Sequence, residues 1–304
     1  MAIFKIHGKK LDQLKTESFG TEFKLQELVD ENLKEIFGLE FIRRELGGQG
    51  FSIDTIAYDP ESKAPVLIEY KKDVQDSVID QGMAYLSWLL NHKGDFLIEL
   101  TEKLGKKDVD WSQARVIFVA RNFNPHQINA LGFKGIPFEL WKYDWSGDIF
   151  QIQQIETPKS DVSITSILKT KPAKEIAKEI KKYSTEDYFK NKPAEMVELF
   201  NKFRSKINEL GDNVSENPQK YYIAYRNPRL NFVSFNIFRD KLRISILLDD
   251  SKLDDPKKIV KNYPSTYGYA KNCKYFDFKI GDNFNYTMGI IEQSYNFNNG
   301  RVGW

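Results

Sequence analysis

The chain has 304 residues, of which 41% are hydrophobic and 29% are charged, and this composition excludes a wholly disordered polypeptide and favours two domains. The mean hydropathy is -0.52, and no apolar run approaches the ~18 residues of a membrane-spanning helix, so we expect no membrane partner. The opening residues lack the apolar core of a secretory signal. A single cysteine, Cys273, excludes an internal disulfide, and we predict a cytoplasmic protein.

The formal net charge of +2 is divided unevenly along the chain. Residues 1–157 carry 19 Lys and Arg against 25 Asp and Glu, whereas residues 158–304 carry 26 against 18. An acidic half that handles phosphate needs a metal ion to offset its charge, while a basic half can meet phosphate directly. The segment 158–172 mixes Pro, Ser, Thr and Lys without sustained periodicity, which is typical of a linker. We therefore predict domains at 1–157 and 173–304, joined by this linker.

The first half predicts an α/β domain with the element order αβββαβ and one further strand. An apolar stripe at helical spacing predicts a helix at residues 22–37, with Thr21 as its N-cap. Strand-like runs separated by turn signals follow, then a second helix and two β-rich runs. The expected ranges are 39–46, 51–58 and 65–72 for the first strands, 77–92 for the helix, and 114–120 and 138–143 for the last strands.

The second half predicts a smaller α+β domain with an antiparallel sheet. Its clearest helix covers residues 193–210, where Pro193 suits the first turn and Gly211 suits the position after the end. A hairpin is expected at residues 232–248. The remaining expected elements are helices at 173–183 and 286–295 and strands at 221–225 and 275–280.

Two neighbouring strands of the first half carry charged side chains in otherwise apolar sequence. Asp54 lies in FSIDTIAY, and fifteen residues later Glu69 and Lys71 stand two apart in VLIEYKK. Side chains two apart on a strand point to one face, so Glu69 and Lys71 project together, and Asp54 joins them if the strands pair. The continuous apolar run before Glu69 is typical of a buried central strand. Charges that end such a strand need a ligand.

A hard divalent cation resolves the repulsion between two poorly hydrated carboxylates. Mg²⁺ prefers oxygen ligands, is often held by one or two carboxylates, and keeps waters that act as nucleophiles. Lys71 would orient or help deprotonate the attacking water, or offset charge that builds on phosphorus. On the next helix Gln81 and Tyr85 form an i, i+4 pair. Gln81 would position the water, whereas Tyr85 is the weaker prediction because tyrosines at helical spacing usually pack in the core.

These residues resemble the PD-(D/E)xK nuclease superfamily, and the Gln-x-x-x-Tyr helix is similar to that of its RecB-type and NucS-like members. The resemblance covers residues 20–145 and implies a restriction-endonuclease-like fold with a mixed sheet. It implies a metal-dependent nuclease that uses Mg²⁺ or Mn²⁺ and acts most naturally on DNA. The metal ligands would be Asp54, Glu69 and the Tyr70 carbonyl, with Lys71 and Gln81 as further catalytic residues.

The start of the first helix, Thr21-Glu22 with Leu25-Gln26, also resembles that superfamily, in which a glutamate of this helix often supports the metal site. Glu22 falls within the apolar stripe of the helix, which favours a site role. An N-terminal glutamate that complements the helix dipole is the alternative, and both interpretations stay open.

The run through FGLEFI, IEYKK and QGMAYLSWL is further similar to an uncharacterised prokaryotic family that joins this half to a C-terminal domain of unknown function. Some members carry the label "predicted transport protein", but the spanning segments that transport requires are missing.

Basic residues of the second half suggest a nucleic-acid surface, although charge runs are usually solvated faces. The candidates are Lys174, Lys178, Lys181 and Lys182, together with Lys72 beside the acidic motif. A protein partner or a homodimer through the C-terminal domain is equally compatible with this half. The rival to the nuclease hypothesis is a non-catalytic module that binds nucleic acid or protein on a nuclease-like scaffold. No GxxxxGK[ST] or GxGxxG motif supports nucleotide use.

Overall fold

The computed structural model describes residues 3–15, 17–48, 50–71, 78–132, 135–156, 162, 170–181, 183–227, 230–264 and 272–299. The chain divides into two compact units, Met1–Lys182 and Tyr183–Trp304. The division therefore lies after the predicted linker 158–172. Of the linker itself only residues 162 and 170–172 are described, and Lys72 and Lys182 also lie outside the described residues.

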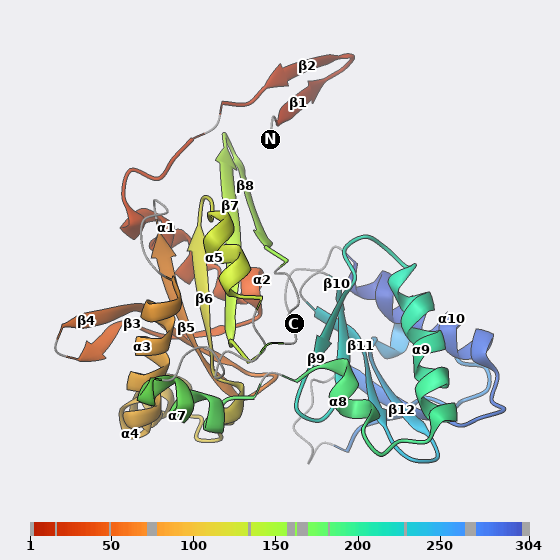
Figure 1. Ribbon diagram of the computed structural model, residues 1–304. Helices are drawn as coiled ribbons and strands as arrows, with labels where there is room; N and C mark the ends of the chain where they lie inside the picture. The colour runs from red at the N-terminus through yellow and green to blue at the C-terminus, as the bar shows by residue number, and fades with distance from the viewer. Residues whose placement is uncertain are drawn as a thin grey trace. The chain divides into compact units, whose positions relative to one another are not determined.

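The first unit is built on a six-stranded mixed sheet in the order β3-β4-β5-β6-β7-β8 (Figure 1). Strands β5, β6 and β7 are parallel, and the other neighbours are antiparallel. The strands are β3 (Glu40–Gly48), β4 (Phe51–Asp59), β5 (Ala64–Lys71), β6 (Arg115–Ala120), β7 (Phe138–Ser146) and β8 (Ile149–Gln154). This arrangement confirms the predicted mixed sheet and adds β8, a strand beyond those predicted.

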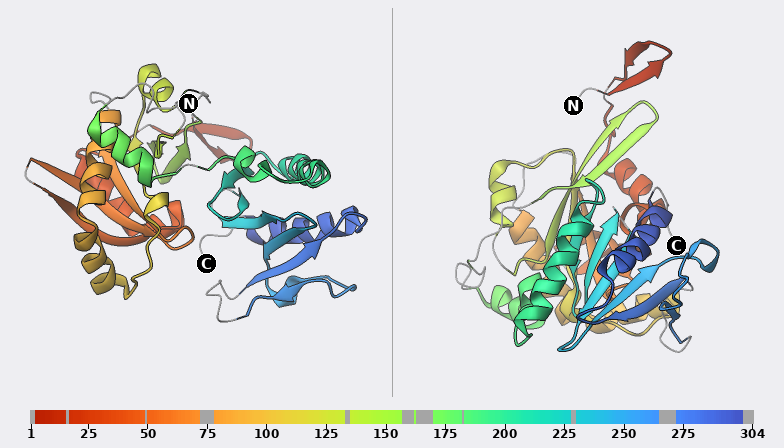
Figure 2. Two further views of the ribbon diagram at one scale, coloured as in Figure 1. Left: turned by 60° about the horizontal axis from the view of Figure 1, so that its bottom comes forward. Right: turned by 90° about the vertical axis from the view of Figure 1, so that its right-hand side faces the viewer.

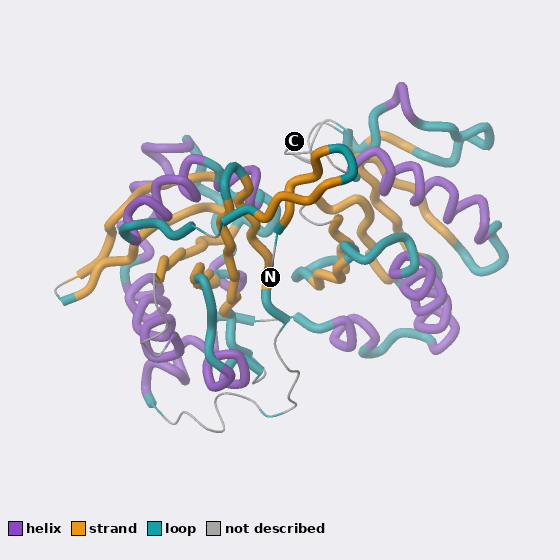
Figure 3. Tube along the Cα trace, turned by 90° about the horizontal axis from the view of Figure 1, so that it is seen from above, coloured by secondary structure: helices purple, strands orange, loops and turns teal. Residues whose placement is uncertain are grey.

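Helices cover both faces of this sheet, as seen from above in Figure 3. Buried side chains of α1 (Glu22–Glu31) and α2 (Leu33–Phe37) pack on one face. Those of α3 (Val78–Asn91), α4 (Lys93–Leu104) and α7 (Lys171–Glu179) pack on the other, with the partly buried Ile128 of the short α5 (Pro125–Ala130). The unit is thus a three-layer α/β/α sandwich whose central strand β5 is buried on both sides.

Two predicted helices differ from those observed. The helix expected at 22–37 ends at Asn32 and restarts as α2, because Asn32 leaves helical geometry with φ -121° and ψ 23° and its side chain caps the Leu28 carbonyl at 2.8 Å. The basic helix expected at 173–183 in the second domain is α7 of the first unit. Ile176 and Ile180 are buried in the core beside α3, and Glu179 forms an ion pair with Lys93 at 2.5 Å. Burial of these isoleucines decides where α7 belongs.

A separate two-stranded hairpin precedes the sandwich. It pairs β1 (Phe4–His7) with β2 (Lys10–Gln13) in antiparallel register. All eight of its side chains are exposed, and Figure 1 draws it apart from the six-stranded sheet.

The second unit is a six-stranded antiparallel sheet in the order β13-β14-β12-β11-β10-β9. Helices α9 and α10 supply apolar side chains to its core, and both are visible in Figure 2. Its elements are α8 (Thr185–Phe189), α9 (Ala194–Asn208), β9 (Ser215–Pro218), β10 (Ile223–Asn227), β11 (Leu230–Ile237), β12 (Leu242–Leu247), β13 (Lys261–Asn262), β14 (Cys273–Phe278) and α10 (Phe284–Asn298). The predicted smaller domain with an antiparallel sheet is therefore confirmed. Among the described helices of the chain, none combines the length and apolarity needed to cross a membrane.

Candidate active site

The candidate site lies where β4 and β5 separate. Their ladder runs to the pair Thr55–Ile68, whereas β4 stays paired with β3 as far as Phe51. At the next residue, Asp54, a side chain replaces the backbone as the partner of β5. The Asp54 Oδ2 accepts a hydrogen bond of 2.9 Å from the backbone N–H of Tyr70. This bond holds the Asp54 carboxylate at the end of β5, beside Glu69.

Glu69 is the centre of the cluster, although its side chain is buried at 3% exposure. Its Oε1 lies 2.8 Å from the Lys71 Nζ and accepts a 2.6 Å hydrogen bond from the Gln81 Nε2. Its Oε2 lies 2.9 Å from the hydroxyl of Tyr85, which donates to it. The end of β5 and the first turns of α3 thus bring Glu69, Lys71, Gln81 and Tyr85 together.

The protonation behaviour of the cluster follows from its burial. Desolvation, followed by the charge of Glu69, raises the pKa of Asp54 from 3.8 to about 7. Burial lowers the pKa of Lys71, but the hydrogen bond and charge of Glu69 outweigh it, so the pKa of Lys71 lies above its ordinary value. Lys71 is therefore an ammonium ion, and Asp54 is near its titration midpoint at neutral pH. The 2.8 Å contact between Glu69 and Lys71 places these two side chains on one side of the sheet.

Gln81 and Tyr85 are coupled to each other as well as to Glu69. The Gln81 Nε2 donates to the Tyr85 hydroxyl at 2.7 Å, and that hydroxyl lies 3.2 Å from the Ser52 carbonyl oxygen. Burial, then the charge of Glu69, raises the pKa of Tyr85, which keeps the phenol protonated. The Gln81 Oε1 is buried and has no hydrogen-bond partner among the described residues. It can accept a hydrogen bond from a bound molecule.

Helix α3 reaches this position because Gly82 has no side chain. A Cβ at Gly82 would lie 2.6 Å from the Phe138 Cζ on β7, closer than any normal contact. The neighbouring Gln81 depends on this close approach to reach Glu69.

Two polar side chains of α1, Gln26 and Asp30, bind β4 and β5 from the face of the sheet opposite to α3. Their i, i+4 spacing puts them on one side of the helix. The Gln26 Nε2 donates to the Asp54 carbonyl at 2.7 Å. Asp30, at 7% exposure, accepts hydrogen bonds from the Thr55 hydroxyl at 2.7 Å and the Tyr70 hydroxyl at 2.8 Å. Neither Gln26 nor Asp30 was a predicted site residue. Their spacing within an apolar stripe is the signal that could have found them.

Glu22, the first residue of α1, is exposed. Its negative charge contributes to the raised pKa of Asp54 and to the raised pKa of Lys71, so it lies near the mouth of the site. Its support of a metal stays a prediction, as does the Tyr70 carbonyl as a ligand.

The donor set fits a hard divalent cation held by few protein ligands. Asp54 and Glu69 supply carboxylate oxygens, and the pKa of Asp54 is raised first by burial and then by repulsion from Glu69, both of which a bound cation would offset. Within the described part of the chain, no three His, Cys, Asp or Glu residues group closely enough to hold a metal. These two carboxylates are too few for a cage made only of protein groups, so a cation held by them would keep several waters.

The described members of the predicted nucleic-acid lysines lie outside this cluster. Lys174 and Lys178 are exposed on α7, and Lys181 is exposed just after it. Glu179, at the end of α7, pairs with Lys93, which lies just beyond the C-terminal end of α3. The site lies at the opposite, N-terminal end of α3. In the second unit, Tyr225 is buried, and its hydroxyl donates to Glu216 at 2.8 Å.

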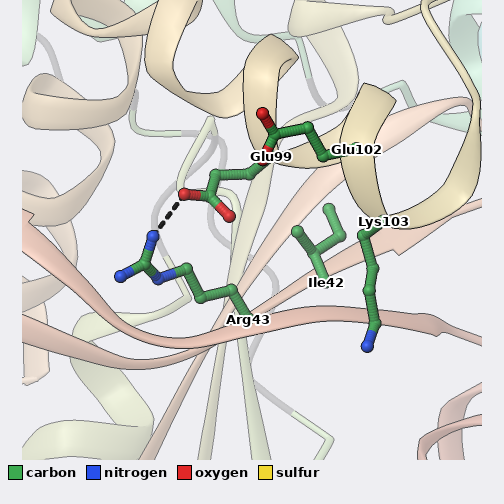
Figure 4. A pocket seen from close by; sticks show the side chains of 5 residues that line it. All are labelled: Ile42, Arg43, Glu99, Glu102 and Lys103. Carbon is green, nitrogen blue, oxygen red and sulfur yellow. Dashed lines mark hydrogen bonds and ion pairs between the residues drawn. The ribbon is translucent and has the colours of Figure 1, made fainter.

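The surface also has an open depression of about 260 Å³ between β3 and α4 (Figure 4). Arg43 and Glu99 form an ion pair within it. None of the candidate site residues lines this depression.

Comparison with known proteins identifies a full-length relative. An uncharacterized protein of Haemophilus influenzae is 37% identical over 300 residues, which cover 97% of this chain and 99% of that protein. The chain belongs to the family of this protein. Residues 185–298 of this chain match the model of a domain of unknown function, DUF5655. The matched range covers most of the second unit.

Solved structures resemble parts of the chain only distantly. A repair endonuclease from Pyrococcus abyssi is 22% identical over 40% of this chain and 47% of its own, with a TM-score of 0.24. EndoMS in complex with double-stranded DNA is 15% identical over 47% and 64%, with a TM-score of 0.26. SfsA of Pyrococcus furiosus with Ca²⁺ is 18% identical over 53% and 77%, with a TM-score of 0.23. Superpositions at these TM-scores establish no activity for the family.

Proposed function

We propose that the first unit is a Mg²⁺- or Mn²⁺-dependent nuclease that hydrolyses phosphodiester bonds of DNA. One observation carries the proposal: Asp54 and Glu69 meet in a poorly hydrated space at the end of β5, with the Lys71 ammonium ion 2.8 Å from Glu69. Two carboxylates beside an ammonium ion suit a metal ion and a phosphate together. The choice of DNA rests on the resemblance of this motif to PD-(D/E)xK nucleases.

In this proposal Asp54 and Glu69 hold the metal ion, which would polarise the phosphate and lower the pKa of its bound water. Lys71 stays protonated because Glu69 raises its pKa. Of the roles open to Lys71, stabilisation of negative charge on the phosphate therefore fits best, and removal of the water proton fits least. The buried Oε1 of Gln81 would accept a hydrogen bond from the attacking water and so fix its direction.

Tyr85 acts indirectly. Its hydroxyl holds the Glu69 Oε2 at 2.9 Å and accepts from Gln81 at 2.7 Å, so it fixes the orientation of both groups. We regard it as a positioning residue and not as a catalytic one.

The test is cleavage of DNA by the purified full-length chain. Single- and double-stranded DNA, with RNA in parallel, are incubated with Mn²⁺ or with EDTA. We expect cleavage of DNA that requires Mn²⁺ and is lost in Lys71→Ala. The matched control is Lys63→Ala, and this variant should cleave like wild type. Lys63 immediately precedes β5, at the end away from the site, and forms an ion pair with Asp108 at 2.6 Å.

Equal cleavage by wild type and Lys71→Ala would remove the proposed role of this site. Cleavage of RNA but not of DNA would contradict the proposal that DNA is the substrate. Absence of cleavage, combined with absence of metal binding, would favour the non-catalytic binding module.

A further inference from the structure

The β1–β2 hairpin presents an apolar face to solvent. Phe4 is 45% exposed, Ile6 73% and Leu11 62%. Ile6 pairs directly with Leu11, and the alternation of side chains along a strand puts Phe4 on the same face. The opposite face is polar, and on it the His7 Nε2 lies 3.6 Å from the Asp12 Oδ2. A lone two-stranded hairpin is marginally stable in water unless one face packs, so this face calls for a covering surface.

The described contacts between this segment and its own sandwich lie at the base of the hairpin. The side chain of Leu14 lies close to Gly147 in the turn between β7 and β8, and the Glu17 N–H donates to the Trp145 carbonyl at 2.8 Å. The apolar face itself remains in solvent.

The same chain carries a surface that complements this face. Strand β8 is the last in the sheet order of the described residues, and an edge strand readily accepts another strand or hairpin. At its start Ile149 is 44% exposed. The charges also match: residues 1–14 contain Lys5, Lys9 and Lys10 against Asp12. In the β7–β8 segment Glu139 is paired with Arg115 of β6 at 2.9 Å, which leaves Lys142 against Asp144 and Asp148. The hairpin is thus net positive and the β7–β8 segment net negative, which favours their association.

We propose that the occupant is a second copy of this chain. The β1–β2 hairpin of each copy packs its Phe4, Ile6 and Leu11 face against Ile149 and the β8 edge of the other copy. Because both surfaces lie on one chain, a two-fold axis makes the contact twice. Reciprocal exchange is needed because a stable interface buries about 800 Å² per partner, more than one short hairpin face supplies. This dimer uses the first unit and differs from a dimer through the C-terminal domain.

The test is the molar mass of the full chain in solution, measured by light scattering after size-exclusion chromatography over a range of concentrations. Wild type should have twice the 35.5 kDa mass of one chain. Ile6→Asp on the hairpin and Ile149→Asp on β8 should each give monomer. His7→Asp is the matched control, because it adds the same charge to the opposite face of the hairpin, and it should remain a dimer. Unchanged melting of the sandwich shows that the monomeric variants are folded.

A mixing experiment tests the geometry of exchange. The Ile6→Asp chain keeps an intact β8 surface and the Ile149→Asp chain keeps an intact hairpin, so a mixture of the two restores one of the two contacts. The mixture should therefore associate, more weakly than wild type, whereas the double variant should stay monomeric. A monomeric wild type would overturn the proposal. So would an Ile6→Asp chain that stays dimeric, or a dimer that Ile149→Asp leaves intact.

Discussion

The replacement Asp54→Asn isolates the electrostatic cost of the candidate site. Asparagine keeps the shape of the side chain and an oxygen that accepts the Tyr70 N–H, a bond of 2.9 Å in the wild type, but it removes the charge. In the folded chain burial and Glu69 raise the pKa of Asp54 from 3.8 to about 7. The folded state therefore binds more protons than the unfolded state between these values, and wild-type stability falls as pH rises through them.

The magnitude follows from about 1.4 kcal/mol for each pKa unit. Between pH 5 and pH 7 the metal-free wild type should lose up to about 3 kcal/mol through Asp54. Asp54→Asn has no such group and loses nothing by this route. We therefore expect the variant to gain up to about 3 kcal/mol relative to wild type when the pH is raised from 5 to 8.

The assay is urea unfolding in EDTA at both pH values, followed by tryptophan fluorescence. Four of the five tryptophans lie in the first unit, so the signal reports mainly on the unit that holds the site. Asp59→Asn is the control on the same strand. Because Asp59 forms an ion pair of 2.9 Å with Arg115, its loss should destabilise the protein at pH 8. A stability difference between Asp54→Asn and wild type that does not change with pH would refute the reasoning.

Three further changes test the groups that hold the site in place. Tyr85→Phe removes the hydroxyl 2.9 Å from the Glu69 Oε2, and we expect a loss of about 1–2 kcal/mol in urea unfolding with slower cleavage by a folded enzyme. Gly82→Ala places a Cβ 2.6 Å from the Phe138 ring, which should cost about 1–3 kcal/mol and weaken Mn²⁺ binding as α3 shifts; an unchanged melting temperature would contradict this packing. Asp30→Ala strips hydrogen bonds from the Thr55 and Tyr70 hydroxyls and the ion pair of 2.6 Å from Arg44, and a loss of about 3–5 kcal/mol is expected in the same assay.

The strands of the site were predictable because their signals are local. The apolar run before Glu69 predicted a buried strand, and β5 is buried along nearly its whole length. The period of two along a strand placed Glu69 and Lys71 on one side, and their 2.8 Å contact agrees. The approach of Asp54 needed only the pairing of adjacent strands, which β4 and β5 make.

Other features depend on tertiary contacts that no local pattern records. The apolar stripe continues across Asn32, so periodicity alone could not reveal the break between α1 and α2. The lysines of α7 suggested a basic surface of the second domain, but the burial of Ile176 and Ile180 places this helix in the first unit. Asp30 could not be distinguished from the other acidic residues of its helix, because its partners on β4 and β5 are distant in sequence.

The most direct test of the site is a Mn²⁺ titration of the full chain, followed by the electron paramagnetic resonance signal of the unbound ion. We predict that wild type takes up one Mn²⁺ per chain, more tightly at pH 8 than at pH 6 because Asp54 must lose its proton, and that Asp54→Asn and Glu69→Gln each abolish this uptake. Binding that both variants retain, or no binding by wild type at millimolar Mn²⁺, would contradict a metal site at the end of β5.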